Sequence, residues 1–248
     1  MEIMYHKYSI RDFVVNDDNF AADIERAYTI GDMIAKKNWK DITIRLGNGI
    51  RADTVVRYPD FIRRYAGIGL NSVSLGIESV VQEVLDATQK DITLEQIDKA
   101  VSILKEHNLD YFLYLQVGLP NDRYENAKKV KEWVKRNDIK CFGVGLTTPY
   151  PKTALWDYIE KNGRFLYPKN EIYKRYPWHN LTNVFPVWET KEFSAEKRMR
   201  ALTELRYFAG MRFLRYGGII ALFRHPAILE WARKWVRYAV FGRIFGKK

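Results

Sequence analysis

Apolar runs alternate with helical patterns through the first 160 residues, and this repetition constrains the fold more than any other feature of the chain. Five short runs rich in β-branched and aromatic residues are predicted to be strands: Arg11–Asn16, Asp41–Leu46, Ser72–Ile77, Tyr111–Val117 and Lys140–Leu146. Helical patterns lie between them, at residues 22–37, 52–66, 80–87, 93–107 and 123–136. Strand–helix repeats of this kind pair their strands in parallel through right-handed crossovers. The pattern predicts an α/β fold, a partial (βα) TIM-like barrel, with an open doubly wound sheet as the alternative.

The domain organisation follows from where this alternation stops. Residues 1–162 are predicted to form the barrel, and residues 163–192 an aromatic and proline-rich connecting segment with little periodicity. Too many large aromatics stand in that segment to be left exposed together, so Trp178, Phe185 and Trp188 are expected to be buried. Residues 193–248 are predicted to be a basic, helical C-terminal extension. Its first helix is expected to run from about Ser194, as N-cap, to Tyr216.

Composition excludes several classes of protein. The chain has 248 residues, of which 47% are hydrophobic, enough for a substantial core. No apolar run is long enough to span a bilayer, and the N-terminus lacks a signal-peptide core, so a cytoplasmic protein is expected. The sequence contains one cysteine, Cys141, which excludes a disulfide framework and a cysteine-only metal site held by this chain alone. Cys141 is expected to be a small buried residue at the start of the fifth strand.

Basic charge is concentrated at the C-terminal end. Residues 191–248 contain fourteen Lys and Arg against four Asp and Glu, a net charge of +10, which leaves +1 for residues 1–190. A nearly neutral body argues against a nucleic-acid partner. Residues 226–248 place tryptophans and aliphatic side chains at helical spacing opposite arginines and lysines. Two uses fit this segment: a peripheral helix on an anionic membrane surface, or a terminal helix packed on the barrel.

Polar residues follow each predicted strand. Asp17 and Asp18 follow the first strand, Arg51 the second, and Glu78 ends the third. A Gly-Leu-Pro turn follows the fourth strand and Thr147-Thr148-Pro149 follows the fifth. Because the carboxyl ends of parallel strands share one rim, these residues predict a ligand-binding mouth in which carboxylates bind an ammonium or ribose hydroxyls and Arg51 binds a carboxylate. Each polar residue by itself is also typical of a helix N-cap or a turn.

Five motifs in order resemble the radical S-adenosylmethionine enzymes, most closely the branch that often carries a cobalamin-binding domain. They are FVVNDDNF, GIRAD, SLGIES followed by VLDATQKDIT, LQVGLPND and TPYPKTAL, and they span about residues 1–190. The resemblance implies an incomplete six-stranded barrel that binds S-adenosylmethionine at its strand ends. It also implies a [4Fe-4S] cluster, with cobalamin as a further cofactor of the parent enzyme.

The same resemblance assigns the cofactor contacts. Asp17 and Asp18 would lie near the amino-acid end of S-adenosylmethionine, and Glu78 near its ribose or amino group. Near the adenine the resemblance places five residues of the last two strand ends: Gly118, Leu119, Pro120, Thr148 and Pro149. Gln116, one pleat before Gly118, is expected to point into the same cavity.

The sequence departs from the family in one respect that decides its chemistry. The family binds its cluster through three cysteines, usually spaced CxxxCxxC after the first strand, and this sequence has no such motif. We therefore expect a radical S-adenosylmethionine core that lacks its first strand and has no activity alone. Three accounts remain: a fragment of a longer enzyme, a split enzyme completed by a polypeptide that carries the cluster motif, or a non-catalytic module that binds a nucleoside-type ligand or a protein.

Overall fold

The computed structural model describes residues 1–175 and 185–218, and these divide into two compact units. Unit 1 comprises Met1–Glu78 and Gln89–Leu115; unit 2 comprises Ser79–Thr88 and the described residues from Gln116 onward. The predicted C-terminal segment 226–248 and Trp178 lie outside the described residues. Of the helices within them, none is both long enough and apolar enough to cross a bilayer.

Five parallel strands form one sheet in the order β1-β2-β3-β4-β5. The strands are β1 (Asp12–Val15), β2 (Thr43–Ile50), β3 (Leu70–Glu78), β4 (Asp110–Val117) and β5 (Phe142–Leu146). All five predicted strands are thereby confirmed. The strand order follows the chain without the reversal that a doubly wound sheet requires, so the barrel-like alternative is the correct one.

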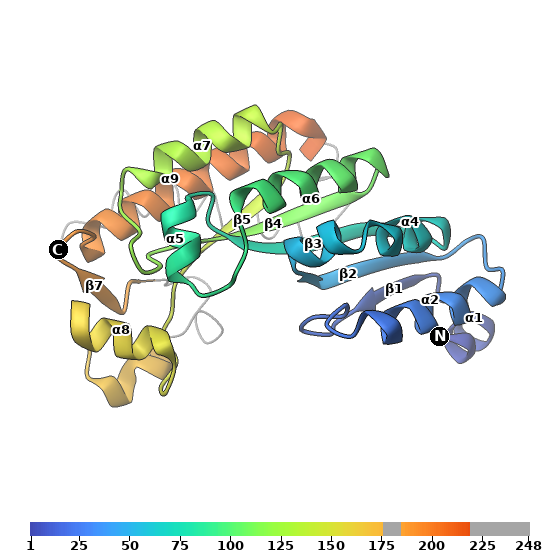
Figure 1. The fold of residues 1–248 in the computed structure, drawn as a ribbon, viewed down its shortest axis with the longest axis horizontal. Helices are drawn as coiled ribbons and strands as arrows, with labels where there is room; N and C mark the ends of the chain where they lie inside the picture. Colours follow the sequence, from blue (N-terminus) through green and yellow to red (C-terminus); the bar gives the residue numbers. More distant parts are fainter. Residues whose placement is uncertain (176–184, 219–248) are drawn as a thin grey trace. The chain divides into compact units, whose positions relative to one another are not determined.

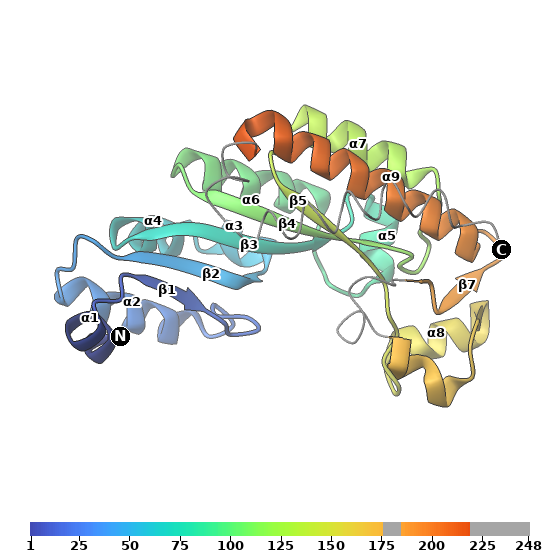
Figure 2. The same ribbon diagram turned by 180° about the vertical axis from the view of Figure 1, so that it is seen from behind.

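Unit 1 contains β1, β2, β3, most of β4 and five helices. These helices are α1 (Glu2–Tyr8), α2 (Ile24–Lys36), α3 (Ala52–Arg57), α4 (Pro59–Gly67) and α6 (Leu94–Glu106). Figure 1 shows α2, α4 and α6 in front of β1, β2 and β3, and Figure 2, from behind, shows the same strands in front of the helices. Alternate strand residues such as Leu46, Leu75 and Leu113 are buried, as are Ile62 and Ile97 of the helices. The core of unit 1 therefore lies between the sheet and this helix layer.

Two helix boundaries are set by local sequence. Thr93 and Gln96 form a capping box at the start of α6, with both reciprocal hydrogen bonds present. The predicted helix at 52–66 is instead two helices that meet at Tyr58. Tyr58 precedes Pro59, whose ring disfavours helical backbone at the preceding residue, and Tyr58 accordingly has φ −127° and ψ 62°.

The second strand is longer than predicted. We expected it to end at Leu46, but β2 continues to Ile50, with a register shift against β3 between Leu46 and Ile50. Gly49 has φ 98°, and a Cβ there would lie 2.6 Å from the Ser74 carbonyl oxygen. Glycine at position 49 thus permits an irregular extension of β2. The sequence Gly-Asn-Gly is typical of a turn, and for this reason the extension was not predicted.

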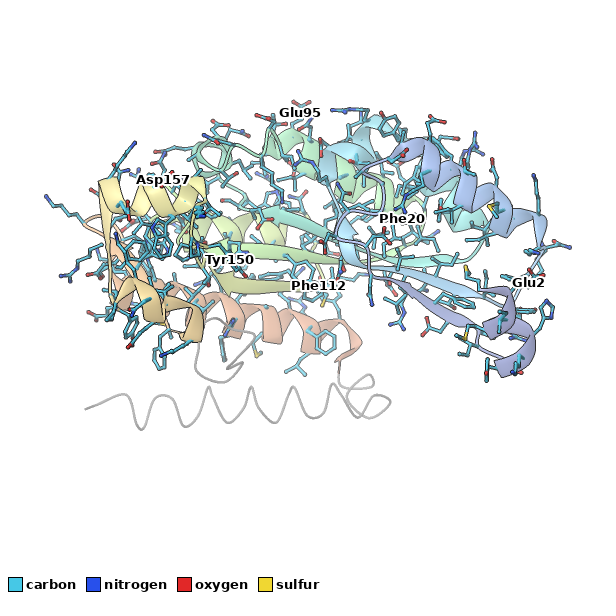
Figure 3. All side chains as sticks on the ribbon, turned by 90° about the horizontal axis from the view of Figure 1, so that it is seen from below. Glu2, Phe20, Glu95, Phe112, Tyr150 and Asp157 are labelled. Atoms are coloured by element: carbon cyan, nitrogen blue, oxygen red, sulfur yellow. The ribbon has the colours of Figure 1, made fainter. Side chains whose placement is uncertain are left out.

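Unit 2 contains the remaining elements. They are α5 (Gln82–Ala87), α7 (Asn126–Arg136), β5, α8 (Ala154–Asn162), β6 (Gly163–Phe165), the 3₁₀ segment η1 (Lys169–Arg175), β7 (Trp188–Thr190), α9 (Ala195–Phe213) and the π-helical segment η2 (Leu214–Gly218). Asp157, which Figure 3 labels, lies on α8. The α9 helix begins after Ser194, whose side chain accepts a hydrogen bond from the Lys197 N–H, as predicted.

The connecting segment is more ordered than its sequence suggests. β6 and β7 pair in antiparallel fashion, and Trp188 is fully buried with Ile159, Ile172 and Val187. The prediction of burial is confirmed for Trp188 but wrong for Phe185, whose side chain is 52% exposed. Cys141 precedes β5 and is half-buried rather than buried.

The side chain of Glu189, in β7, is hydrogen-bonded to the first residue of α9. Its carboxylate accepts a hydrogen bond from the Ala195 N–H (2.7 Å) and another from Arg164 Nε (2.8 Å). The Ala195 N–H, followed by Arg164, holds the pKa of Glu189 below its ordinary value of 4.5. The charged form is therefore favoured in the folded chain, at the positive end of a helix dipole.

We predict that Glu189→Gln lowers the free energy of unfolding by about 1 kcal/mol at pH 7, because a charge-assisted bond becomes a neutral one. A group with a lowered folded pKa contributes stability above its unfolded pKa and loses it as the pH falls through the folded value. The difference between wild type and variant should therefore persist at pH 5.5 and shrink below the unfolded value of 4.5. Urea unfolding at several pH values measures it, with the exposed Glu192→Gln as control; a difference independent of pH would contradict the prediction.

Candidate functional site

The predicted site residues fall into two groups, one in each unit. In unit 1, Glu78 ends β3 with φ 60°, a left-handed conformation that is uncommon for a residue with a side chain. A register shift against β4 lies between Gly76 and Glu78. Such backbone strain persists only where the surroundings determine it, and it is concentrated at functional positions.

The Glu78 carboxylate is paired with Lys90. Lys90 Nζ lies 2.5 Å from Glu78 Oε1 and also donates to the Gly76 carbonyl at 2.9 Å. Both side chains of this pair are about one quarter exposed. A Cβ at Gly76 would lie 3.1 Å from Glu78 Oε1 and 3.3 Å from Lys90 Nζ, so glycine leaves room for the pair.

Arg51 belongs to the same group. It donates through Nε to Asp53 (2.9 Å) and through Nη2 to the Lys90 carbonyl (2.5 Å). The structure thus brings Arg51, Glu78 and Lys90 together, two cations and a carboxylate at the carboxyl ends of β2 and β3. A neighbouring carboxylate and ammonium can bind the two charges of an amino acid.

The two aspartates after β1 have different surroundings. Asp17 forms an ion pair with Arg26 of α2 at 2.8 Å, with both side chains nearly half exposed. Asp18 is exposed. Asn19, the next residue, has a buried side-chain oxygen without a hydrogen-bond partner among the described residues. The loop after β1 therefore contains a polar atom that an additional group could satisfy.

In unit 2 both the N–H and the carbonyl of Gly118, in the Gly-Leu-Pro turn, form hydrogen bonds with side chains. Its N–H donates to Asp122 Oδ2 at 2.8 Å, and its carbonyl accepts from Arg198 Nη1 at 3.2 Å. Gly118 has φ 88°, and a Cβ there would lie 2.5 Å from Arg198 Nη1. Glycine is required at this position for conformation and for space.

Arg198 of α9 is a buried cation that holds this turn in place. It is 2% exposed, it donates through Nε to the Phe193 carbonyl (3.0 Å), and its guanidinium stacks on the Trp188 ring at 3.7 Å. Burial lowers the pKa of Arg198 to about 10, against the opposing effect of Asp122 and Glu189. Burial likewise raises the pKa of Asp122, although Asn126 and the Gly118 N–H donate to its carboxylate. The guanidinium stays charged at neutral pH and anchors the turn.

Two polar atoms at the ends of β4 and β5 lack partners among the described residues. They are Gln116 Oε1 and Thr147 Oγ1, both buried. Gln116 Oε1 lies 3.5 Å from where a Gly145 Cβ would stand, so this glycine keeps the space beside the amide open. The neighbouring Thr148 Oγ1 donates to the Leu146 carbonyl at 3.4 Å and its backbone leads to Pro149. Buried unpaired polar atoms are rare, and a hydrogen-bonding ligand is one way to satisfy them.

Residues 19–162 match the family model described as the Radical SAM superfamily. The chain belongs to the radical SAM superfamily. Its relatives include an uncharacterized methyltransferase of Pyrococcus horikoshii, 26% identical over 82% of this chain and 41% of the relative. The anaerobic magnesium-protoporphyrin IX monomethyl ester cyclase of Rubrivivax gelatinosus is 22% identical over 64% of this chain and 28% of the relative. The radical SAM chain thus spans less than half the length of the curated relatives that it matches.

Solved structures show the same fold. The radical SAM methyltransferase TsrM of Kitasatospora setae, solved with cobalamin and a [4Fe-4S] cluster, superposes with a TM-score of 0.58 at 14% identity, over 66% of this chain and 35% of that one. Elp3 of Methanocaldococcus infernus gives a TM-score of 0.51 at 15% identity, over 84% and 47%. The prediction of a radical SAM barrel fold is confirmed.

The residues of this radical SAM chain suit the two family cofactors unequally. In unit 1 the Glu78–Lys90 pair has the two charges that would match those of an amino acid. In unit 2 the Gln116 side-chain oxygen is a buried acceptor without a partner among the described residues. A [4Fe-4S] cluster needs three thiolates, and the sequence contains only Cys141, so this chain lacks the ligands for such a cluster.

Sequence reasoning missed Lys90 and Arg198. Lys90 stands inside the motif VLDATQKDIT, twelve residues after Glu78, between the helices predicted at 80–87 and 93–107. This short interruption was a usable signal that the chain could return to the strand end. Arg198 is 80 residues from Gly118 in the chain. No local pattern connects the two.

Gly118→Ala should destabilise unit 2 by about 2–4 kcal/mol, because a side chain there is strained at positive φ and overlaps Arg198. Gly67→Ala is the matched control, since a Cβ at that position meets nothing within 4 Å. Thermal unfolding followed by circular dichroism compares the two. Equal melting temperatures for the two variants would refute the assignment of Gly118.

Proposed function

We propose that this chain is the S-adenosylmethionine-binding part of a radical SAM enzyme whose [4Fe-4S] cluster is held by cysteines outside this sequence. The observation that carries the proposal is the family match over residues 19–162 in a sequence with one cysteine. Without three thiolates the chain has no route for an electron to the sulfonium. It is accordingly inactive in radical chemistry by itself.

In unit 1 the proposed ligands act on the amino-acid end of S-adenosylmethionine. That end carries an ammonium and a carboxylate, which match Glu78 and Lys90 in charge. The two side chains already lie 2.5 Å apart, and so are held ready in adjacent positions. Arg51 keeps the Lys90 backbone in place through its hydrogen bond to the carbonyl. Asp17 and Asp18 remain proposed contacts of the same end, and Asp17 would first have to leave Arg26.

In unit 2 the proposed ligands act on the adenine. Gln116 Oε1 is a buried acceptor suited to an amino group, and the turn Gly118-Leu119-Pro120 offers backbone to a flat ring. Thr148 and Pro149 are proposed contacts by the same reasoning. Arg198 and Asp122 act indirectly, because they fix the conformation of Gly118.

For the assembled enzyme we propose methyl transfer, with cobalamin as a further cofactor. Support comes from the names of the relatives, which include the Pyrococcus methyltransferase and the hopanoid C-2 methylase of Rhodopseudomonas palustris. TsrM, whose structure contains cobalamin, is also a methyltransferase.

The binding proposal predicts a difference between two ligands. S-adenosylmethionine should bind the chain weakly, with a Kd on the order of high micromolar to millimolar, because the cluster that anchors its amino-acid end is absent. Lys90→Met should weaken S-adenosylmethionine binding about tenfold or more, as expected for loss of a charge-assisted bond, and Glu78→Gln should do the same. Methylthioadenosine lacks the amino-acid part and should bind both variants as it binds wild type.

Calorimetry measures both ligands, with Lys99→Met, an exposed lysine of α6, as the matched control. If Lys90→Met and Glu78→Gln change the affinity for neither ligand, the pair only stabilises the end of β3. The assignment of Glu78 and Lys90 as contacts of S-adenosylmethionine would then be wrong. Equal weakening for the two ligands would indicate a general disturbance of the fold.

A second prediction concerns iron. Anaerobic reconstitution of the chain with iron and sulfide should leave less than about one iron per chain, because a stable cluster needs at least three thiolate ligands. Cys141→Ala should give the same iron content and the same absorbance spectrum. A stoichiometric four-iron cluster that is lost in Cys141→Ala would defeat the proposal.

A further inference from the structure

Two aromatic side chains of β4 lie on the sheet face opposite to the helices of unit 1. Leu113 and Leu115 are buried, whereas Phe112 is half-buried and Tyr114 is 44% exposed. Because the side chains of a strand alternate between its two faces, Phe112 and Tyr114 share the face opposite to the buried leucines. Figure 3 shows Phe112 on the side of the strands away from Glu95 of α6. Both rings therefore point away from the helix layer.

The rings of Phe112 and Tyr114 are in contact and inclined to each other. Their centroids are 4.8 Å apart, and the angle between their planes is 60°. This separation is within the range in which aromatic rings attract each other through face and edge. A further flat ring that stacks on one of them would meet the edge of the other, so both would contribute to its binding.

The residues opposite these rings on β3 are small. By register, Ser74 stands opposite Phe112 and Gly76 stands opposite Tyr114. Neighbouring strands lie about 4.8 Å apart, so a large side chain at either position would cover the rings. An exposed tyrosine by itself is common on protein surfaces. A pair of rings with serine and glycine beside it is a more specific feature, because it leaves room for a ligand next to both.

Charged side chains stand at the two ends of this face. Toward the amino ends of the strands, Asp12 and Arg45 form an ion pair at 2.5 Å, and Asp110 begins β4. At the carboxyl end of β3, Glu78 and Lys90 form the second ion pair. The strand positions between these ends, on this face of unit 1, are uncharged: Val14, Gly47, Ser74, Gly76, Phe112 and Tyr114. Since burial of an unpaired charge is costly, the ligand that fits between the ends is uncharged there.

We propose that Phe112 and Tyr114 determine the substrate class of the enzyme, because they bind a flat, uncharged ring system of the substrate. The inference rests on the proposed function, in which the amino-acid end of the cofactor binds Glu78 and Lys90. Gly76 connects the two places, since it stands opposite Tyr114 and a Cβ there would lie 3.1 Å from Glu78 Oε1. A ring stacked on Tyr114 would therefore lie next to the proposed contact of the cofactor.

The test uses indole as a flat, uncharged probe and cyclohexanol as a non-planar molecule for comparison. Each is titrated into the full chain and followed by ligand-observed NMR. Indole should bind at least about tenfold more tightly than cyclohexanol, because only a flat ring gains the stacking contact. Tyr114→Leu and Phe112→Leu should each weaken indole binding about tenfold, since leucine is apolar but has no ring. Tyr114→Phe keeps the ring and should remain within about twofold of wild type.

Two further variants separate loss of the site from a disturbance of the fold. Ser74→Leu leaves both rings in place but fills the space beside Phe112, so it should also weaken indole binding about tenfold. Tyr8→Leu removes a ring that is 57% exposed elsewhere in unit 1, and it should bind indole as wild type does. Circular dichroism checks that each variant is folded. Equal indole affinity in Tyr114→Leu, Phe112→Leu and Tyr8→Leu would overturn the proposal, as would equal binding of indole and cyclohexanol by wild type.

Methylthioadenosine distinguishes a substrate site from a site for the base of the cofactor, which is also a flat ring. Saturation with methylthioadenosine should leave the affinity for indole at least as high as before. Displacement of indole would assign the rings to adenine and overturn the proposal. Calorimetry with S-adenosylmethionine on wild type tests the proposed function separately. If S-adenosylmethionine binds and indole shows no dependence on the rings, only the substrate assignment fails; if S-adenosylmethionine does not bind, the proposed function fails and the substrate assignment fails with it.

Discussion

The parallel backbone ladder is the constraint on which the other features of this chain depend. Parallel strands cannot be joined by tight turns, so each pair needs a crossover that returns the chain to the same end of the sheet. In unit 1 these crossovers are helices, and they bury side chains of β2, β3 and β4, Leu46 and Leu75 among them. All carboxyl ends then point the same way. Parallel pairing therefore places the loops that follow the strands at the same end of the sheet, whether or not a ligand binds there.

Each of the strand ends described for Glu78 and Gly118 is held by side chains that come from other parts of its own unit. Glu78 adopts a left-handed conformation that costs roughly 1–2 kcal/mol for a residue with a side chain. Lys90 holds its carboxylate. Gly118 avoids that cost but is fixed instead by a carboxylate on its N–H and a guanidinium on its carbonyl. Removal of Arg198 would leave the Gly118 and Phe193 carbonyls without this buried donor, so we expect Arg198 to fix the conformation of the turn.

The sequence was informative where a local pattern determines the structure. The alternation of apolar runs predicted all five strands, and Ser194 predicted the start of α9, because each signal acts over a few residues. Errors arose where backbone chemistry overrode the pattern: Pro59 divided a predicted helix, and Gly49 allowed β2 to continue through an apparent turn. For the candidate site, the sequence predicted which polar residues lie at the ends of the strands. The contacts of Lys90 with Glu78 and of Arg198 with Gly118 join residues that the tertiary fold brings together. The periodicity of the sequence does not predict which distant residues meet.

The pairing of Glu78 with Lys90 also bears on how weak cofactor binding could become specific. A ligand zwitterion that meets two unpaired charged side chains must pay for their ordering, whereas a preformed ion pair has already lost that entropy. In the proposed function, the zwitterion would exchange the single contact between the two side chains for one charge-assisted contact with each of them. A ligand without the amino-acid part would leave the ion pair as it is and make neither contact. The proposed pair would thus distinguish the two kinds of ligand through two contacts, and the loss of either side chain would remove one of them.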